Sequence, residues 1–452
     1  MYCGRKAVTT LIAAILLLWP VGSEEITNST TVKKLSVDEA VRTALKTHVD
    51  IQRSSLSLKQ TEREYRHSWN SFLPAITADG NGKKLNYYSD PVSDTVTVTA
   101  GVGASLSLDA GLGSKIAKLK SEYEAGILDY DDTLRSVEYT VREAYYELLY
   151  YKENFLVSQK SVDSYQQQYD LTLKKRNSGL ATELDLLTAQ VDLETAKTDL
   201  QSAYSSYMNK MLEFLNTIGM EYDTTIELSG ALDYAESAAV IDKASVLDNC
   251  EEKSSDVKAL ENKIKTAKYS RNQTFYSSFL PSMNLDASVY PEYQSFEKKS
   301  DTETRTPYWS VSVGISLPVD CWVPGSSAHD TVAELDDTIK DYELQLTDKK
   351  KDVRTDIVEK LDQIEQSQAT LKARHLNAGL AKKSYEMTQE AYQRGTKDLI
   401  TLQSALDTYH SAQLQLSSEQ YTLICNVLDL EKALSLPSDA FFTNTTTEEV
   451  SK

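Results

Sequence analysis

Proline and glycine are scarce in this sequence, with 9 and 16 residues among 452. Both residue types weaken or end helices, because proline lacks a backbone N–H and glycine loses the most conformational freedom on folding. Their scarcity permits unusually long helices. The stretch 114–177 contains one glycine, Gly126, and no proline, and its apolar residues recur at steps of three and four over many heptads. We predict one continuous helix of coiled-coil type there.

Basic residues and cysteines are also few. The 48 Lys and Arg residues stand against 67 Asp and Glu, which gives a net charge of −19. This balance argues against a nucleic-acid partner, because phosphates require a basic surface. Apart from Cys3 in the leader, the cysteines are Cys250, Cys321 and Cys425. Three dispersed cysteines form no disulfide framework and have no metal-ligand spacing, so we expect no metal and no cofactor.

Long hydrophobic runs are missing except near the start. Arg5 and Lys6 precede an apolar run over 11–19, and small residues follow before Glu24. This order is typical of a secretory signal peptide, which we place at 1–23. No cysteine stands where a lipoprotein signal would need one. The sequence therefore predicts an exported protein without an evident lipid anchor.

Four segments, at 76–83, 96–108, 283–289 and 309–317, alternate between apolar or small residues and polar ones, as β-strands do. Between 96 and 108 one parity holds aliphatic residues and the other holds Thr, Gly and Ser. A strand of about 13 residues is longer than most globular strands. It has the pattern of an outer-membrane barrel strand, apolar toward lipid and polar toward a lumen, although a soluble sandwich can alternate in the same way.

The chain repeats one order of elements, which predicts an internal duplication. Tyr169 and Tyr385, like Gly179 and Gly395, are related by an offset of 216. The predicted elements are a helix at 35–69, a hairpin at 72–108, a long helix at 114–177 and a helix at 182–218, within a first repeat at 24–218; a connector at 219–244; a helix at 245–273, a hairpin at 279–318, a long helix at 329–394 and a helix at 397–434, within a second repeat at 245–436; and a polar, frayed tail at 437–452.

Four membrane strands in one chain cannot close a barrel. Lipid does not tolerate an open sheet edge, because each unpaired backbone group there costs several kcal/mol. Two chains would supply eight strands, whose interior is filled by side chains, whereas three would supply twelve and leave a lumen. The geometry therefore favours a cyclic homotrimer.

Several short motifs occur in a fixed order. L-S-V-D-E-A-V stands at 35–41, F-L-P precedes each predicted hairpin, and G-L-A-T-E-L-D and R-G-T-K-D-L-I-T-L stand at the two helix turns. In their joint order these motifs resemble the TolC-like outer membrane efflux protein family, over nearly the whole chain from 35 to 436. The resemblance implies an α+β membrane protein of the bacterial outer membrane: a trimer with a twelve-stranded β-barrel, four strands per chain, continued by a long periplasmic α-helical coiled-coil barrel.

The family resemblance also implies a function. The trimer would be the passive exit duct of a tripartite efflux or type I secretion system, docked to a periplasmic adaptor protein and an inner-membrane transporter. Its substrates would be drugs, other small molecules or polypeptides. The residues do not separate efflux from secretion, because specificity usually resides in the transporter.

The resemblance assigns roles at the two predicted helix tips. It implies a periplasmic gate latch made of Asp185, Lys397 and Tyr392. A carboxylate, an ammonium and a phenol can form contacts weak enough for a partner to break. The alternative is ordinary pairing of solvated side chains at helix ends.

Two further sets of positions come from the same resemblance. The acidic ring that constricts the pore of relatives falls at Thr401 and Ser404, which are uncharged, so the resemblance does not extend to cation binding at the constriction. The turns at Gly179 and Gly395 would dock the adaptor.

Two other classes of protein fit the sequence less well. An enzyme needs a convergent set of reactive groups, and neither the five scattered histidines nor any recognised catalytic motif provides one. An exported, soluble coiled-coil scaffold or adaptor without a pore would have the same helices. The two hairpins argue against it, because a scaffold has no use for four long alternating strands.

Overall fold

The computed structural model describes most of the chain. The described residues are 33–85, 95–222, 226–232, 235, 241–248, 250–297, 302–305, 307–437 and 440–442. The predicted signal peptide, the last ten residues of the predicted tail and parts of the predicted connector lie outside these ranges.

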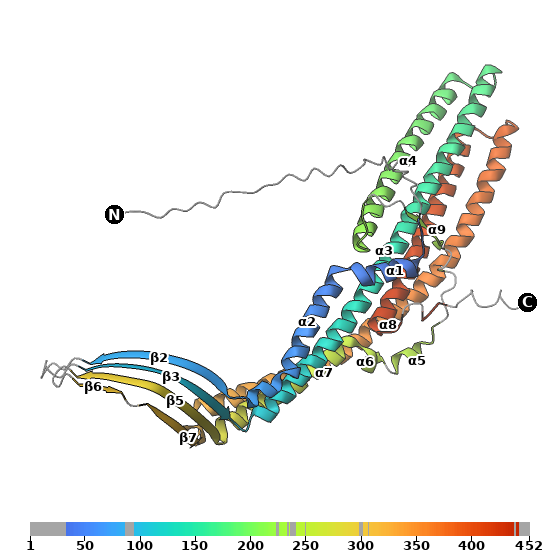
Figure 1. Ribbon diagram of the computed structural model, residues 1–452. Helices are drawn as coiled ribbons and strands as arrows, with labels where there is room; N and C mark the ends of the chain where they lie inside the picture. The colour runs from blue at the N-terminus through green and yellow to red at the C-terminus, as the bar shows by residue number, and fades with distance from the viewer. Residues whose placement is uncertain are drawn as a thin grey trace, which may run out of the picture.

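Long helices form a rod, and the strands form a curved sheet at one end of it (Figure 1). Helix α3 (Leu112–Asn177) runs the length of the rod, beside α2 (Val49–Arg66) and α7 (Ser255–Phe279) near the sheet and beside α4 (Glu183–Thr217) farther away. Helix α8 (Ser327–Gln393) is its counterpart and pairs with α9 (Leu399–Ala433). The turns between α3 and α4 and between α8 and α9, called the helix tips below, lie at the end of the rod far from the sheet.

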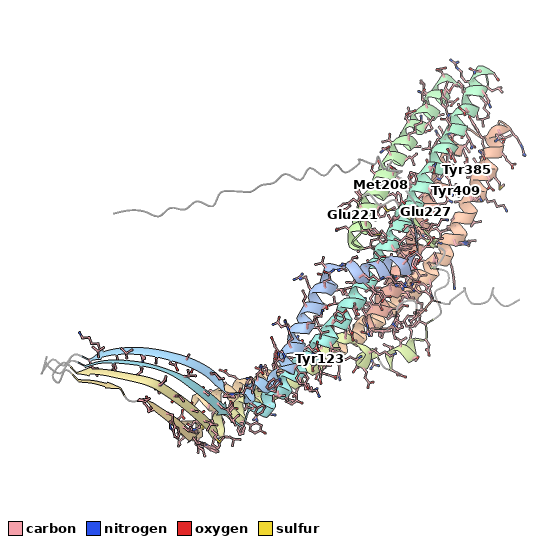
Figure 2. The ribbon with its side chains drawn as sticks, in the orientation of Figure 1. Tyr123, Met208, Glu221, Glu227, Tyr385 and Tyr409 are labelled. Carbon is pink, nitrogen blue, oxygen red and sulfur yellow. The ribbon has the colours of Figure 1, made fainter. Side chains whose placement is uncertain are left out.

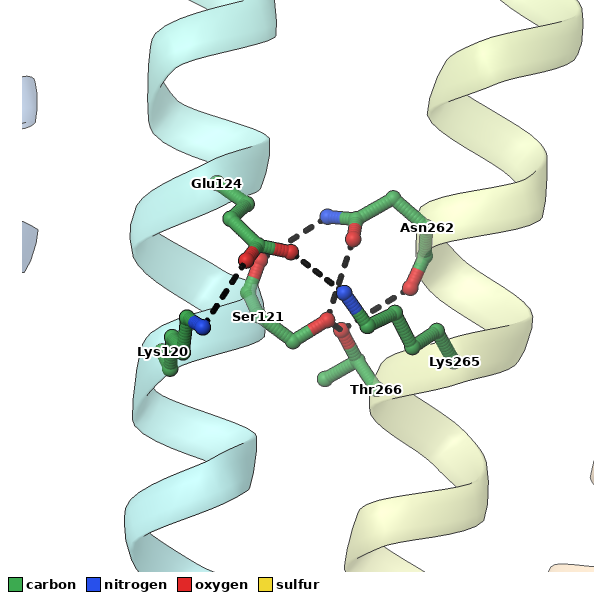
Figure 3. A network of polar contacts seen from close by, with 6 residues as sticks. All are labelled: Lys120, Ser121, Glu124, Asn262, Lys265 and Thr266. Atoms are coloured by element: carbon green, nitrogen blue, oxygen red, sulfur yellow. Dashed lines mark hydrogen bonds and ion pairs between the residues drawn. The ribbon is translucent and has the colours of Figure 1, made fainter.

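One polar contact holds α3 against α7 near the sheet (Figure 3). Ser121, 1% exposed, donates its hydroxyl to the Asn262 side-chain oxygen at 3.0 Å and lies 2.8 Å from the Thr266 hydroxyl. The Asn262 amide donates to the Ser121 carbonyl at 2.9 Å. Lys265 and Glu124 form an ion pair on the solvent side of the same contact. The buried polar groups are therefore mutually satisfied, as burial requires.

The sheet contains strands from both halves of the chain. Its order is β2 (Ala75–Leu85), β3 (Thr95–Leu108), β5 (Ser282–Glu297) and then a last position shared by two pieces. These pieces, β6 (Thr302–Arg305) and β7 (Tyr308–Ser316), both pair with β5. All pairings are antiparallel, and β3 with β5 joins the two halves.

Two predicted helices differ from those observed. The predicted helix 35–69 is broken at His48, whose extended backbone ends α1 (Val37–Thr47) and whose ring accepts a hydrogen bond from the Asp50 N–H at the start of α2. The predicted helix 245–273 is preceded by short helices α5 (Lys243–Leu247) and α6 (Cys250–Lys253), and α7 runs on to 279. It ends at Leu280, whose backbone is extended because Pro281 follows.

In the second hairpin, β6 ends at Arg305 and β7 begins at Tyr308, directly after Pro307, which has no N–H to donate to the ladder. One further expectation needs correction. The predicted tail is not frayed at its described start. Phe442 is buried in the main core, and the Phe441 N–H donates to the Glu431 carboxylate at 3.1 Å. These two aromatic side chains give the segment apolar area to bury.

The main hydrophobic core lies midway along the rod. A short parallel pair, β1 (Lys33–Leu35) with β4 (Ile226–Leu228), joins α1 and the inner ends of α4 and α9 there. Tyr145 of α3 is almost fully buried, and its hydroxyl lies 3.1 Å from the Leu35 carbonyl oxygen. Toward the tips the core becomes two small clusters, so the outer part of the rod has fewer buried apolar contacts.

Candidate functional site at the helix tips

Both helix tips end in the same glycine turn. Gly179 and Gly395 have φ values of +72° and +78°, which L-residues with a side chain rarely adopt. At the first tip the Leu180 N–H donates to the Lys175 carbonyl at 2.8 Å, and at the second the Thr396 N–H donates to the Ala391 carbonyl at 2.9 Å. This is the Schellman arrangement that satisfies the last carbonyls of a helix. The glycines thus serve the backbone of the turn.

The helices that leave the tips are capped by threonine and aspartate pairs. At α4 the Asp185 N–H donates to the Thr182 hydroxyl at 3.1 Å, and the Thr182 N–H donates to the Asp185 carboxylate at 2.8 Å. At α9 the Thr401 N–H donates to the Asp398 carboxylate at 2.9 Å. Hydrogen bonds from the Thr401 side chain and backbone hold the pKa of Asp398 below its usual value. Asp185 and Thr401, two predicted site residues, therefore also hold the first turns of their helices.

Tyr392, the third residue of the predicted latch, is buried between the ends of α3 and α8. Its hydroxyl lies 3.0 Å from that of Thr172, and the Lys175 ammonium lies 3.5 Å from the centre of its ring. Lys175 also donates a hydrogen bond to the Tyr392 carbonyl. Burial lowers the pKa of Lys175. These three residues, called the Tyr392 contact below, join the two coiled coils within one chain.

The chain does not bring the other predicted latch residues together. Within one chain no hydrogen bond or ion pair joins Asp185 to Lys397 or to Tyr392, although all three are described. Lys397 is exposed. Ser404 accepts a hydrogen bond from the Thr408 hydroxyl through its backbone carbonyl, and it contributes no charge. A latch through Asp185 and Lys397 would therefore have to join different chains.

The sequence reasoning missed Thr172 and Lys175 as site residues. Lys175 is one of three consecutive basic residues in the last turn of α3. Positive charges at a helix C-terminus interact favourably with the helix dipole in any protein. Nothing in that run distinguishes Lys175 from exposed Lys174. The one available signal was the alignment of the two halves, which shows that Thr172 and Thr388 are equivalent but does not show what Thr172 contacts.

Two absences can be stated for the described part of the chain. There, no helix is long and apolar enough to cross a membrane. Nor do any three His, Cys, Asp or Glu side chains in the described ranges gather as a metal ion would require.

Residues 40–219 and 246–435 match the outer membrane efflux protein family. Among curated proteins, the chain is 20% identical over 423 residues to the probable efflux pump outer membrane protein TtgC of Pseudomonas putida, covering 88% of this chain and 82% of that protein. The toluene efflux pump outer membrane protein TtgC of another Pseudomonas putida strain matches over the same shares at the same identity.

Solved structures share the fold. The open state of the Neisseria gonorrhoeae MtrE outer membrane channel has a TM-score of 0.72 and 20% identity, over 88% of this chain and 89% of that one. The Vibrio cholerae outer membrane protein VceC has a TM-score of 0.71 and 14% identity, over 88% and 95%.

The family match spans most of the chain, so the chain belongs to the outer membrane efflux protein family. It is an efflux channel of the TolC-like kind, located in the bacterial outer membrane. The soluble scaffold considered from the sequence is excluded by this membership.

Proposed function

We propose that three copies of this chain close a twelve-stranded barrel in the outer membrane and extend into the periplasm as a tube of helices. The observation that carries this proposal is the chemistry of the two sheet faces. One row across all four strands contains Ile76, Ala104, Ala287 and Val311, whereas the adjacent row contains Thr77, Gly103, Ser288 and Ser310. An apolar outer face toward lipid and a polar inner face toward water are what a barrel pore requires.

The sheet edges support closure by several chains. Among the described strands, β2 and β7 each pair with one neighbour. The apolar side chains near these edges are strongly exposed in one chain, with Ile76 at 76% and Ile315 at 77%. An open edge in lipid leaves backbone groups unpaired, so pairing between chains removes that penalty.

The outer parts of the helices also have unpartnered apolar faces. On α4 the exposed residues lie three or four positions apart, which places them on one face. They are Leu184, Leu187 and Val191. On α8 a similar face is formed by Leu376, Leu380 and Met387. We propose that the α4 face of one chain packs against α8 of the next chain in the ring.

In this proposal the two halves of the chain are copies of one unit. The similar lengths of α3 and α8, 66 and 67 residues, and of α4 and α9, both 35 residues, support it. Three chains would then place six similar helix tips around the periplasmic end, where an adaptor would dock at the turns of Gly179 and Gly395.

The chain would pass substrate without performing chemistry on it, as the outer part of a tripartite pump with an adaptor and an inner-membrane transporter. We favour efflux of small molecules over polypeptide secretion, because the relatives are named as toluene and antibiotic efflux pump proteins. The periplasmic end would be closed in two ways: by the Tyr392 contact within each chain and by Asp185 with Lys397 between chains. Thr401 and Ser404 would line an uncharged constriction.

The test is single-channel conductance of the detergent-extracted protein in a planar bilayer, with its mass measured in the same detergent. The proposal predicts a trimer and discrete, small conductance steps. A monomeric or dimeric mass with no conductance would overturn the closed barrel. A trimer that inserts but shows no steps would retain the barrel and contradict a conducting duct.

A further inference from the structure

A cavity of about 460 Å³ lies between α3, α4 and α9, on the tip side of the main core. It lies near the stacked rings of Tyr385 and Tyr409, which are labelled in Figure 2 and have centroids 5.9 Å apart. His410, the residue after Tyr409, lines it. Its volume falls in the range of small-molecule sites, about 300–1000 Å³.

Three carboxylates line this cavity, Asp192 and Asp199 from α4 and Asp407 from α9. The Gln403 amide donates to one oxygen of Asp192, and the Tyr165 hydroxyl donates to one oxygen of Asp407. No ion pair joins any of the three to a Lys or Arg of the described chain. Burial, followed by the charge of Asp407, raises the pKa of Asp192. The cavity thus concentrates negative charge that is not neutralised locally.

His410 is the second, independent sign of a ligand. His410 is 8% exposed, and both of its ring nitrogens are buried without a hydrogen-bond partner in the described chain. Burial lowers the pKa of His410, which favours the neutral ring with one nitrogen that accepts a hydrogen bond. Buried polar atoms are nearly always partnered. A donor bound in the cavity would satisfy this nitrogen.

We propose that the cavity binds an aliphatic diamine or polyamine. Its ammonium groups would donate hydrogen bonds to the free oxygens of Asp192 and Asp407 and to His410. An ammonium carries three donors, so one group can reach acceptors that lie apart. The apolar lining residues Val157 and Leu414 suit the methylene chain between the ammonium groups. A bare metal ion fits less well, because no three potential ligands of the described chain gather as it would need.

Bound there, the amine would join helices from both halves of the chain. Asp192 belongs to α4 and Asp407 to α9, and their negative charges repel each other. A cation between them replaces repulsion with two charge-assisted hydrogen bonds. This role in the wall of the helices does not depend on the conducting function proposed above.

The first experiment is calorimetric titration of the full-length protein in detergent with spermidine at neutral pH. We expect one saturable site per chain. Asp192→Asn and Asp407→Asn should each weaken binding about tenfold, because each removes a charged acceptor. The matched control is Asp337→Asn, which removes an exposed charge of α8 and should leave the affinity unchanged. Equal affinities in all four proteins, or heat that never saturates, would overturn the site.

A second pair of variants tests the imidazole. His410→Gln retains an acceptor and should bind within about threefold of the wild type. His410→Leu introduces an apolar side chain with no acceptor and should bind about tenfold more weakly. Asp192 and Asp199 of α4, Asp407 of α9 and Tyr165 of α3 line the same cavity as His410. Acidification should also weaken binding, because it protonates His410 and Asp192. Binding that is insensitive to both His410 variants and to acid would overturn the assignment.

Discussion

Thr182 and Asp398 occupy equivalent N-cap positions at the starts of α4 and α9, and each is partnered by the complementary residue three positions on. Thr182 pairs with Asp185, and Asp398 pairs with Thr401. The same two residue types therefore cap both helices in opposite order. Asp185 can take part in a gate only in addition to this capping role, so an Asp185→Ala variant would mix two effects.

The first prediction separates the latch from the cap. Asp185→Asn retains a side-chain oxygen that accepts from the Thr182 N–H, but it loses the charge needed for an ion pair with Lys397 of another chain. Because that pair would help to close the periplasmic end, we expect larger conductance steps. Thr182→Ala removes the cap and should destabilise the first turn of α4 by about 1 kcal/mol, without enlarging the steps. Faster amide hydrogen exchange in that turn would verify the loss of the cap. The latch is wrong if Thr182→Ala enlarges the steps as much as Asp185→Asn, or if neither does.

The second prediction concerns the Tyr392 contact. Lys175→Met removes both the hydrogen bond to the Tyr392 carbonyl and the cation over its ring, an interaction worth about 1–2 kcal/mol in a partly buried site. We expect a several-fold larger open fraction in planar-bilayer recordings. Tyr392→Phe removes only the hydrogen bond to Thr172 and should have a smaller effect.

The control for Lys175→Met is the neighbouring residue. Lys174 has the same side chain, lies in the same turn and is exposed. Lys174→Met should therefore leave the open fraction unchanged. An equal effect of the two substitutions would show that net charge near the tips, rather than the Tyr392 contact, controls opening.

The periodicity of the sequence predicted the long elements because their signal is repeated many times. The helix predicted at 114–177 corresponds to α3 at 112–177. Repeated heptads of apolar residues without a proline favour one continuous helix over any other regular structure. The F-L-P motifs place the change from helix to strand because Leu73 and Leu280, each before a proline, have extended backbones.

Single residues that act through tertiary contacts were not predictable in the same way. His48 breaks the first helix because its ring accepts a hydrogen bond from the Asp50 N–H, and histidine has no strong preference for that role. The Tyr392 contact joins residues 217 and 220 positions apart, so local pattern could not reveal it. Likewise, nothing local in the sequence of α4 showed that Asp192 would be half-buried near Asp407 of α9.

The third prediction compares the two halves of the polar contact in Figure 3. Asn262→Leu removes the two hydrogen bonds that the Asn262 side chain forms with the hydroxyl and the carbonyl of the buried Ser121. The free energy of unfolding should fall by about 1–3 kcal/mol, because a buried polar group loses its hydrogen bond. Lys265→Met breaks an ion pair that is partly exposed on both sides and should change stability by less than about 1 kcal/mol.

Denaturant unfolding followed by circular dichroism measures both variants in one detergent. The Thr266 hydroxyl also lies against Ser121, so Ser121 keeps one partner in Asn262→Leu. A double variant, Asn262→Leu with Ser121→Ala, should therefore recover part of the lost stability. Equal losses for Asn262→Leu and Lys265→Met would show that burial does not decide the strength of this contact.

The fourth prediction is that Asp192→Asn stabilises the protein at neutral pH and not in acid. Burial and the charge of Asp407 raise the pKa of Asp192, so the folded state binds its proton more tightly than the unfolded state does. Stability from this group is therefore fully present below the unfolded pKa and is lost as the pH rises through the folded pKa. Asparagine keeps an oxygen for the Gln403 amide and carries no charge. We expect Tm to rise by about 1 °C near neutral pH.

The difference between variant and wild type should shrink as the pH falls through the raised pKa of Asp192, and it should vanish near pH 3, below the ordinary aspartate pKa of about 3.9. His410 titrates in the opposite sense, because its lowered pKa makes the protein lose stability as the pH falls through the folded value. That loss occurs in both proteins, so subtracting the two melting curves at each pH isolates Asp192. A gain of the same size at both pH values would mean that it does not come from removing a buried charge. Asp337→Asn, made at an exposed site of α8, should show no gain at either pH, because its charge is already solvated.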